Sequence, residues 1–379
     1  MPVSEPHGFE PPPYPYDRLD DLRAVADRLP GGAVDLSIGT PCDPPPSAVV
    51  AALGSSGAER GYPPSVGTPA LREAAAGWLE RRFGVTLVPA DLAACVGTKE
   101  LVTGVPHWLR LRSPARDTVL YPRISYPSYA MGATLAGCRA VPYARLGDVD
   151  PEDAARALCV WVNSPGNPTG EVDDLGAAAA WGRGHGVPVL SDECYIEFTW
   201  QGPGRTIVAG GLDGVLAVHS LSKRSNLAGA RSGFYAGDGD LVGYLSEVRK
   251  HAGLMVPGPV QAASVLAFGD DAHVEAQRAV YHRRLVLMQG VLAALGVECP
   301  LPQGAFYLWA PAPGGDAWAL ARRLATEAGA IVSPGEFYGP AGAGHVRIAV
   351  VQPDDRLALV AQRLGLDAAA VADGTVRSA

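Results

Sequence analysis

The stretch GVLAVHSLSKRSNLAGARSGF, residues 214–234, joins an apolar run to a turn that is rich in hydroxyl, basic and glycine residues. The run has the length and composition of a buried strand, and Ser220, Ser222 and Lys223 stand at its end. Lysine is scarce in this chain, with three lysines among the 31 basic residues. Because arginine does not lose its proton near neutral pH, an amine nucleophile has to be a lysine. Lys223 is therefore the first candidate for amine chemistry.

Two other apolar runs also end in polar side chains. ALCVWV leads into NSPGNPTG, which places Asn163 and Asn167 in a turn, and VPVL leads into SDECY, with Asp192 and Tyr195. Each has a structural alternative, because NPTG is a good turn sequence, an aspartate caps helices, and a lysine after a strand is commonly solvated. In open α/β sheets, however, ligands bind beyond the carboxyl ends of the strands. An amide, a carboxylate and an amine at three strand ends together predict a binding site.

Further residues suit an anionic, ring-shaped ligand. VGTKELV places Gly97 and Thr98 where a strand passes into a helix, so that backbone N–H groups and the helix dipole can hold a phosphate. Arg231 offers a two-pronged donor, and Gly229 before it allows close approach of the backbone. Tyr126 in SYPSY offers a flat face on which a ring can stack.

Composition limits the class of partner. The chain has 379 residues, is 47% hydrophobic and 18% charged, and carries a formal charge of −8, which disfavours a nucleic-acid partner. No apolar run is long enough for a membrane span, and residues 1–21 contain no apolar core that would make them a secretory signal. The six cysteines are scattered without a CxxC pair, which favours free thiols in a reducing cytoplasm over a metal site. We expect a cytoplasmic protein whose partner is a small molecule or a second copy of itself.

The chain changes character along its length. Thr68 and Pro69 are typical of a helix start, and from about residue 96 to 236 apolar runs alternate with helical stretches, which indicates a mostly parallel sheet covered by helices. Beyond residue 271 come longer helices, such as DAWALARRLATEAG, around the strand-like AFYLWA and HVRIAV. This tail, together with the strand-like AVDLSIG near the start, predicts a smaller α+β domain.

NSPGNPTG, SDECY, SLSK and the interval from Lys223 to Arg231 resemble the fold-type I pyridoxal-phosphate enzymes of the class I and II aminotransferase family, over nearly the whole chain. The resemblance implies an α/β fold whose large domain has a mostly parallel mixed sheet covered by helices, with a smaller α+β domain. We place the large domain at residues 46–280 and the small domain at 1–45 and 281–379. The implied cofactor is pyridoxal 5′-phosphate, and the implied assembly is a homodimer with shared active sites.

The resemblance also implies a role for individual residues. Lys223 would hold the cofactor covalently and then move a proton, Asp192 would pair with the pyridine nitrogen, and Tyr195 would bond the phenolic oxygen. The other implied cofactor contacts are Gly97, Thr98, Lys99, Tyr126, Asn167, Ser220, Ser222, Arg231 and, reaching the partner subunit's phosphate, Tyr62. The implied substrate contacts are Gly39, Asn167 and Arg347. Taken alone, an arginine in the alternating run HVRIAV is typical of an exposed position, whereas the resemblance implies that it binds the substrate α-carboxylate.

SIGTPCDPPP, GYPPSVGTPALREA, GTKELV and SPGEFYGPAGAGHVRIAV are similar to segments of actinobacterial succinyldiaminopimelate aminotransferases of lysine synthesis. This narrower resemblance implies N-succinyl-L,L-2,6-diaminopimelate and 2-oxoglutarate as substrates. Because such a donor carries further carboxylates, basic groups should line the cleft. The candidates near the motifs are Lys99, Arg123, Arg224, Arg249 and Lys250. No role follows for Asn226.

Several alternatives remain open from the sequence. The amino donor could instead be aspartate, acetylornithine or an aromatic amino acid, and the same fold also carries out β-lyase and decarboxylase chemistry. A non-catalytic sensor would need a DNA-binding module, for which the proline-rich start is too short. Ser220 to Lys223 also fits the S-x-x-K motif of acyl-serine enzymes, but no S-D-N or K-T-G element follows it. An aminotransferase is the interpretation that accounts for all the motifs.

Overall fold

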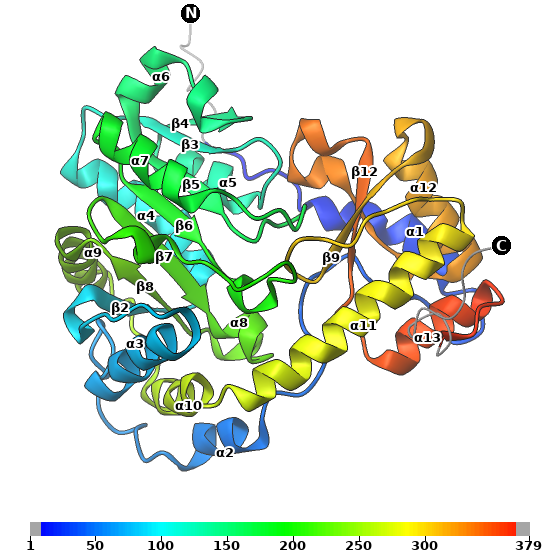
Figure 1. Cartoon of the computed structure of the whole chain (residues 1–379), viewed down its shortest axis with the longest axis horizontal. Helices are drawn as coiled ribbons and strands as arrows, with labels where there is room; N and C mark the ends of the chain where they lie inside the picture. The colour runs from blue at the N-terminus through cyan, green and yellow to red at the C-terminus, as the bar shows by residue number, and fades with distance from the viewer. Residues whose placement is uncertain (1–8, 369–379) are drawn as a thin grey trace, which may run out of the picture.

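Seven strands form the main sheet of the molecule, whose computed structural model describes residues 9–368 (Figure 1). The strands lie in the order β2-β8-β7-β6-β5-β3-β4, and β8 is antiparallel to both of its neighbours while the other pairs are parallel. Their bounds are β2 Leu92–Cys95, β3 Thr118–Pro122, β4 Arg139–Tyr143, β5 Ala157–Asn163, β6 Val189–Asp192, β7 Val215–Ser220 and β8 Gly233–Gly237. This mixed, mostly parallel sheet confirms the predicted fold class.

The register of the central strands brings their polar ends to one edge of the sheet. Asn163 pairs with Asp192 across β5 and β6, and Asp192 pairs with Val218 of β7. Ser220 ends β7, and the short helix α8 (Leu221–Arg224) follows at once. Every residue of these three strands is buried, as expected for strands covered on both faces. The three strand ends therefore meet, as the sequence predicted.

Helices cover both faces of the main sheet. Trp78 and Phe268 belong to the core on one face, which is formed with α2, α3, α7 and α10, and Tyr129 and Trp161 belong to the core on the other, formed with α4, α5 and α9. The bounds are α2 Ser47–Ser55, α3 Pro69–Phe83, α4 Thr98–Arg112, α5 Ser128–Leu135, α6 Pro151–Arg156, α7 Leu175–His185, α9 Gly239–His251 and α10 Gly258–Gly269. The Thr68 hydroxyl accepts the Leu71 N–H at 3.3 Å, which confirms the predicted start of α3.

A second body with its own sheets lies beside the first (Figure 1). It has an antiparallel sheet in the order β11-β12-β9 and a parallel pair of β1 with β10. Apolar residues such as Met288, Leu308 and Val346 share one core there. The bounds are α1 Asp20–Ala26, β1 Val34–Asp35, α11 Ala272–Ala294, β9 Tyr307–Pro311, α12 Ala317–Arg323, β10 Ala330–Ile331, β11 Ser333–Pro334, β12 His345–Ala349 and α13 Asp354–Arg363. Helix α11 runs from beside α10 to this body (Figure 1).

Some elements differ in length from the sequence expectation. The strand-like AVDLSIG contributes only the two residues of β1, because the chain then turns toward the main sheet's edge. DAWALARRLATEAG forms α12, and its last turn, Leu324–Ala328, widens to a π-helix before the left-handed Gly329. The predicted domain boundary at residue 280 falls inside α11. The placement of the domains at 46–280 and at 1–45 with 281–379 stays a prediction.

Residues 9–368 give no indication of a membrane span or a metal centre. The helices there include none with the length and apolar character that crossing a membrane requires. Histidine, cysteine, aspartate and glutamate side chains form no group of three or more with a geometry that suits a metal ion in that range. All six cysteines, which lie within it, are free thiols.

Candidate active site

A cavity of about 820 Å³ lies at the edge where β5, β6 and β7 end, next to the second body. Both bodies contribute to its wall, since Asp192 comes from the main sheet and Arg347 from β12. The predicted site residues on its wall are Gly39, Thr98, Lys99, Tyr126, Asn167, Asp192, Tyr195, Ser220, Ser222, Lys223, Arg231 and Arg347. The structure thus brings together twelve side chains or backbone positions that lie far apart in the sequence.

Asp192 is a buried carboxylate without a bonded cation. One of its oxygens accepts the Tyr129 hydroxyl at 2.9 Å, and the other accepts the Cys194 backbone N–H at 3.2 Å. Burial raises the pKa of Asp192, while these hydrogen bonds and the charge of Lys223 act in the opposite direction. The geometry therefore suits a cationic N–H in the cavity that would pair with this carboxylate.

Lys223 projects from α8 into the same cavity, where its Nζ donates a hydrogen bond to the Gly39 carbonyl. Burial, together with the nearby charges of Arg347 and Arg231, lowers the pKa of Lys223 to about 8, while Cys194 and Asp192 act in the opposite direction. It forms no ion pair with any residue in the described range. A useful fraction of this side chain is therefore neutral amine near neutral pH.

Hydrogen-bond donors gather at another part of the wall. Arg231 has a left-handed backbone (φ 57°), its Nη1 donates to the Ala228 carbonyl at 2.8 Å, and no carboxylate of the described residues pairs with it. A Cβ added at Gly97, the residue before α4, would lie 2.1 Å from Arg231 Nη2, so the missing side chain makes room for the guanidinium. Ser220 and Ser222 line the cavity nearby. Hydroxyls, a guanidinium and a helix N-terminus form a donor set that suits a phosphate.

Arg347 is only 3% exposed, so an exposed position in an alternating strand is the wrong interpretation of HVRIAV. Its Nη1 donates to Asn167 Oδ1 at 2.8 Å and its Nη2 to the Ser37 carbonyl at 2.5 Å, while the buried Nε has no partner among the described residues. The rings of Tyr307 and Tyr338 lie 4.3 and 4.7 Å from the guanidinium carbon. A buried guanidinium bonded only to neutral oxygens is suited to an incoming carboxylate.

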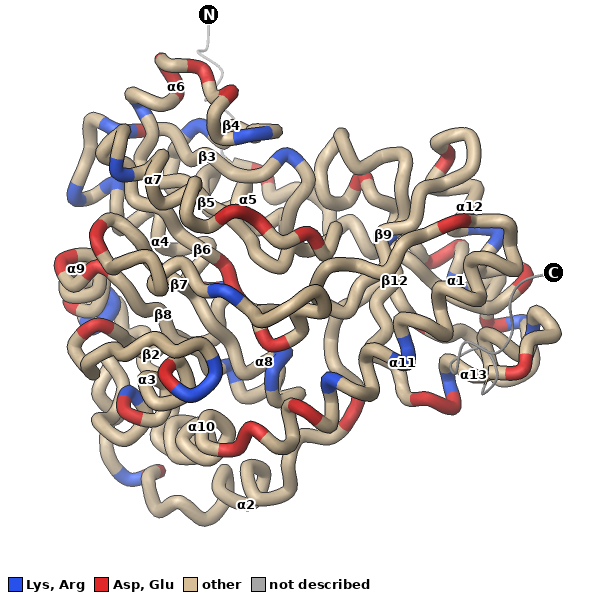
Figure 2. Tube along the Cα trace, in the orientation of Figure 1, with Lys and Arg blue, Asp and Glu red and all other residues tan. Residues whose placement is uncertain are grey.

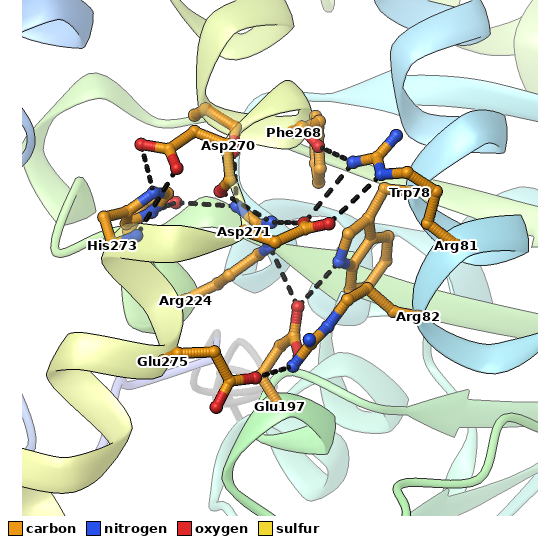
Figure 3. A network of polar contacts seen from close by, with 12 residues as sticks. Trp78, Arg81, Arg82, Glu197, Arg224, Phe268, Asp270, Asp271, His273 and Glu275 are labelled. Atoms are coloured by element: carbon orange, nitrogen blue, oxygen red, sulfur yellow. Dashed lines mark hydrogen bonds and ion pairs between the residues drawn. The ribbon is translucent and has the colours of Figure 1, made fainter.

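Four of the five candidate basic groups for distal carboxylates are not on the cavity wall, and only Lys99 is. Arg224 is buried and binds Glu197 at 3.2 Å and Asp271 at 3.0 Å (Figure 3). Arg249 is buried in an ion pair with Glu100 at 2.6 Å. A carboxylate partner offsets the cost of burying a guanidinium, and for both arginines that partner lies away from the cavity. Arg123 is exposed, and Lys250 lies on the surface of α9, 3.6 Å from Glu247.

Tyr62 is also outside the cavity, with a side chain that is 96% exposed.

Basic and acidic residues are interspersed along the trace of residues 9–368 (Figure 2). The figure thus gives no sign of the long basic stretch that binding to a phosphate backbone uses.

Sequence reasoning missed several residues of the site. Tyr129, which donates to Asp192, lies in SYPSY, a segment from which only Tyr126 was expected at the site. Tyr307, whose hydroxyl lies 2.7 Å from that of Tyr195, lies in AFYLWA, which was expected only to form a strand. Arg18 and Glu336, paired at 2.7 Å, also line the cavity. The sequence could not reveal this pair, because residues more than 300 positions apart form no local pattern.

The donor set fits pyridoxal 5′-phosphate in each of its functional groups. The buried Asp192 carboxylate suits a protonated pyridine nitrogen, and Tyr126 on the wall offers a ring face. Arg231 with the two serines and the start of α4 suits the phosphate. Lys223 is an amine whose lowered pKa suits imine chemistry with the aldehyde.

Comparisons with known proteins agree with this geometry. The sequence profile of the family described as aminotransferase class I and II matches residues 32–364. The 4-dedimethylamino-4-oxo-anhydrotetracycline transaminase OxyQ of Streptomyces rimosus is 44% identical over 363 residues, covering 94% of this chain and 99% of OxyQ. A probable aminotransferase of Mycobacterium tuberculosis is 43% identical over 366 residues, covering 93% and 85% of the two chains. The solved structure of a probable N-succinyldiaminopimelate aminotransferase from Thermus thermophilus superposes with a TM-score of 0.82 at 32% identity, covering 93% of this chain and 99% of that one.

Proposed function

Because this chain belongs to the class I and II aminotransferase family, whose members use pyridoxal 5′-phosphate, we propose that it transfers the amino group of N-succinyl-L,L-2,6-diaminopimelate to 2-oxoglutarate. The observation that carries the choice of substrate is the arrangement of basic groups on one cavity wall. Arg347 is free of carboxylate partners among the described residues, and Lys99 and Arg18 lie on the same wall. A donor with an α-carboxylate and a distal carboxylate would use Arg347 and Lys99, with Arg18, which pairs with Glu336 at 2.7 Å, beside them. Similarity to the Thermus thermophilus protein supports the same substrate class.

The proposed residue roles follow from the donor set. Gly97, Thr98, the Lys99 backbone, Ser220, Ser222 and Arg231 would hold the phosphate, and Tyr126 would stack on the ring. Asp192 would keep the pyridine nitrogen protonated, and Asn167 with Tyr195 would bind the phenolic oxygen. When bound, the cofactor supplies an electron sink for chemistry at the substrate α-carbon.

The protein's own part in the chemistry is to orient the substrate and to move a proton. Arg347 would bind the α-carboxylate of each substrate, with Gly39 and Asn167 beside it. Lys223 Nζ would hold the cofactor, and as a free amine it would take the proton from the substrate α-carbon and deliver it to the cofactor carbon that carries the aldehyde. Such a base works best when its pKa is near the working pH, and burial lowers the pKa of Lys223 to about 8. The tyrosine pair of Tyr195 and Tyr307 closes the wall beside it against water.

A second candidate is amination of a bulky ring ketone. It is favoured by the 44% identity to OxyQ and by the apolar part of the cavity wall. That part is formed by Pro11, Pro12, Pro13, Tyr14, Pro15, Ile38, Met131 and Phe337. Apolar rings of this kind bind flat aromatic substrates.

A homodimer with shared active sites is part of the proposal. Tyr62 has no contact with its own cavity and is almost fully exposed, so it is available to a second copy. Sedimentation would test this, and a monomer at working concentration would contradict it.

The test of the proposed function is a half-reaction titration of the holoenzyme, followed through the cofactor's absorbance. The donors are N-succinyl-L,L-2,6-diaminopimelate, L,L-diaminopimelate, acetylornithine, aspartate and aromatic amino acids, each followed by 2-oxoglutarate. We expect the succinylated donor to give the highest kcat/KM and 2-oxoglutarate to restore the starting spectrum. If another donor reacted and the succinylated donor did not, the substrate assignment would be wrong. Release of pyruvate or CO2 would indicate a lyase or a decarboxylase.

A matched pair of lysine variants sharpens this test. Lys99→Ala should raise the KM of the succinylated donor roughly tenfold, the effect of losing one charged hydrogen bond, and should leave the KM of alanine unchanged. Lys250→Ala removes an exposed lysine of α9 and should change neither. Equal effects of the two variants would exclude a distal-carboxylate role for Lys99.

A further inference from the structure

The residues that follow Lys223 are docked on helix α11. Arg224 donates through Nη2 to Asp271 Oδ1, at the N-cap of that helix, at 3.0 Å (Figure 3). Ser225 Oγ lies 3.0 Å from Nε2 of His273, in the first turn. Arg224 is also held by Glu197 at 3.2 Å. Because this guanidinium is buried and bonded on several sides, the backbone just after Lys223 has little freedom to move.

Asn226 extends the same docking one turn further along α11. It has a left-handed backbone (φ 52°), a conformation that asparagine accepts more readily than most residues. Its Nδ2 donates to Gln277 Oε1 at 3.0 Å, and its Oδ1 accepts the Tyr281 hydroxyl at 3.2 Å. Both hydrogen-bonding ends of this side chain are thus used by α11.

Gln277 connects this contact to the segment near the start of the chain. Its Nε2 donates to Asp43 Oδ2 at 2.8 Å, and the same carboxylate receives both Nη atoms of Arg284 at 2.6 and 2.8 Å. Asp43 is four residues after Gly39, whose carbonyl accepts the Lys223 Nζ. Together with the chain segments 223–226 and 39–43, these contacts close into a ring that runs from Lys223 through Asn226, Gln277 and Asp43 to Gly39 and back to Lys223.

We propose that Asn226, Gln277 and Asp43 are positioning residues, which hold the Gly39 carbonyl against Lys223 Nζ and so fix where the amine points. This inference rests on the proposed role of Lys223. The link depends on a neutral amide at position 277, because it must accept from Asn226 on one side and donate to a carboxylate on the other. It also gives α11, which spans the two bodies, a direct connection to the reactive amine.

Loss of the Gln277 contacts should shift the pKa of Lys223 in a predictable direction. A fixed carbonyl oxygen stabilises the charged ammonium, so a Gly39 carbonyl that is free to move stabilises it less and the pKa of Lys223 falls. The other charged or titratable groups around this amine are Asp192, Cys194, Arg231 and Arg347. None of these four contacts Gln277. A change at residue 277 therefore reaches the amine through the ring of contacts.

The experiment compares Gln277→Ala with Gln289→Ala. Both glutamines lie partly buried on α11, but Gln289 donates to the Cys299 carbonyl, outside the ring. The full-length protein without cofactor is pulsed with acetic anhydride over a series of pH values, and acetylation of Lys223 is read by peptide mass spectrometry. Only unprotonated amine reacts, and the exposed Lys250 serves as the internal reference.

We expect the half-point of Lys223 labelling to fall by about half a pH unit in Gln277→Ala and to stay unchanged in Gln289→Ala. The kcat of the holoenzyme should fall about fivefold, the weight of one hydrogen bond, with little change in KM. An unchanged half-point in Gln277→Ala would overturn the proposal. Asn226→Gly, which keeps the left-handed backbone, should give the same shift, and the double variant should add nothing further.

The two proposals fail in different ways. If the Lys223→Ala holoenzyme still transaminated, the proposed function of Lys223 would be wrong, whatever the labelling results. If Lys223→Ala is inactive but Gln277→Ala and Asn226→Gly both label as the parent does, only the positioning role is wrong. Should Gln277→Ala fail to fold, the Asn226→Gly labelling curve decides the matter alone.

Discussion

Asp192 and Glu193 are adjacent carboxylates with different surroundings. Asp192 lies on the cavity wall, whereas Glu193 is completely buried, accepts the Ile207 N–H at 2.8 Å and lies 3.5 Å from His219. Burial raises the pKa of Glu193 to about 8 and lowers that of His219 to about 3. Both side chains are therefore neutral together in the folded protein around neutral pH.

This buried pair gives the stability of the protein a defined pH dependence. As pH rises above 6.5, the histidine of the unfolded state loses its remaining proton, while Glu193 stays protonated in the folded state and loses its proton on unfolding. The effect of Glu193 outweighs that of His219, so the free energy of unfolding should fall, by about 1 kcal/mol, as pH rises from 6.5 to about 8. Between pH 4.5 and 6.5 the two side chains have opposite effects on stability, since His219 binds its proton only in the unfolded state.

Glu193→Gln should abolish the fall above pH 6.5. Urea denaturation at half-unit steps of pH measures it, with the exposed Glu247→Gln as the control that keeps the fall. A variant with the same slope as the parent would show that Glu193 is ionised in the folded state.

Tyr129 is the residue whose loss should most directly affect Asp192. Tyr129→Phe removes the hydroxyl that donates to the carboxylate at 2.9 Å, so the pKa of Asp192 should rise further and its pairing with a ring nitrogen should weaken. We expect kcat to fall roughly tenfold, as for a lost hydrogen bond to a charged group. Steady-state kinetics measure this.

Tyr143→Phe is the matched control for Tyr129→Phe. It also removes a tyrosine hydroxyl, that of a half-buried side chain, which donates to the Trp161 carbonyl away from the cavity. It should cost a similar amount of stability and leave kcat unchanged. Equal kcat values for the two variants would mean that the Tyr129 hydroxyl has no effect on the reaction.

At the scale of elements, the start of α4 is fitted to the side chain of Arg231. Gly97 has a left-handed backbone (φ 71°), and a Cβ there would collide with Arg231 Nη2 at 2.1 Å. The absence of a side chain at Gly97, just before α4, thus leaves the space that the Arg231 guanidinium occupies. The donors at this part of the cavity depend on both elements.

Gly97→Ala should therefore weaken cofactor binding as well as stability. A non-glycine residue in this backbone region costs about 1 kcal/mol or more, and displacement of Arg231 should raise the dissociation constant of pyridoxal phosphate about tenfold or more. Gly84→Ala, at the end of α3, has nearly the same φ (68°) but nothing within 4 Å of its Cβ. Spectral titration should find weaker binding of pyridoxal phosphate only in Gly97→Ala. Equal affinities of the two variants for the cofactor would show that Gly97 does not contribute to cofactor binding.

The elements and strand ends were predictable because their signals are local. An apolar run that ends in Asn163 or Asp192 is visible in a few residues, and so is the helix start at Thr68. Contacts between distant segments were not predictable, so Arg224 and Arg249 were placed at the cleft although Glu197 and Glu100 draw them into the interior. Whether an arginine is buried depends on whether a carboxylate lies beside it. Only the folded structure shows that Glu197 and Glu100, which are distant in the sequence, lie beside these two arginines.

At the scale of the whole molecule, Arg347 and one of its acceptors, Ser37, belong to the second body, while the other acceptor, Asn167, belongs to the first. Its strand β12 lies in the second body, Asn167 follows β5 of the main sheet, and Ser37 lies near the start of the chain. The proposed carboxylate site is therefore assembled only when these three parts are in place. Both substrates of the proposed reaction carry an α-carboxylate and would use this one site in turn.

Arg347→Lys should raise the KM of the amino donor and of the oxo acid together. A lysine keeps the charge but loses the two-pronged geometry, so we expect an increase of about tenfold or more for each. Arg356→Lys is the control, because Arg356 also donates to carbonyls near the start of the chain, those of Gly31 and Ala33, but lies outside the cavity. A rise for one substrate only, measured by steady-state kinetics, would mean that the two carboxylates bind at different places.

Lys223 and Arg347 hold the segment around residue 38 through the main-chain oxygens of Gly39 and Ser37. A backbone carbonyl accepts a hydrogen bond whatever side chain its residue carries. These two hydrogen bonds therefore do not depend on which side chains residues 37 and 38 carry. Gly39 is constrained instead, because a Cβ there would meet the Tyr307 hydroxyl at 2.1 Å. Ile38, which is 42% exposed and faces the cavity, is thus free to drift during evolution. Divergence at that one position offers a lineage a route to new amino donors while the anchoring contacts persist.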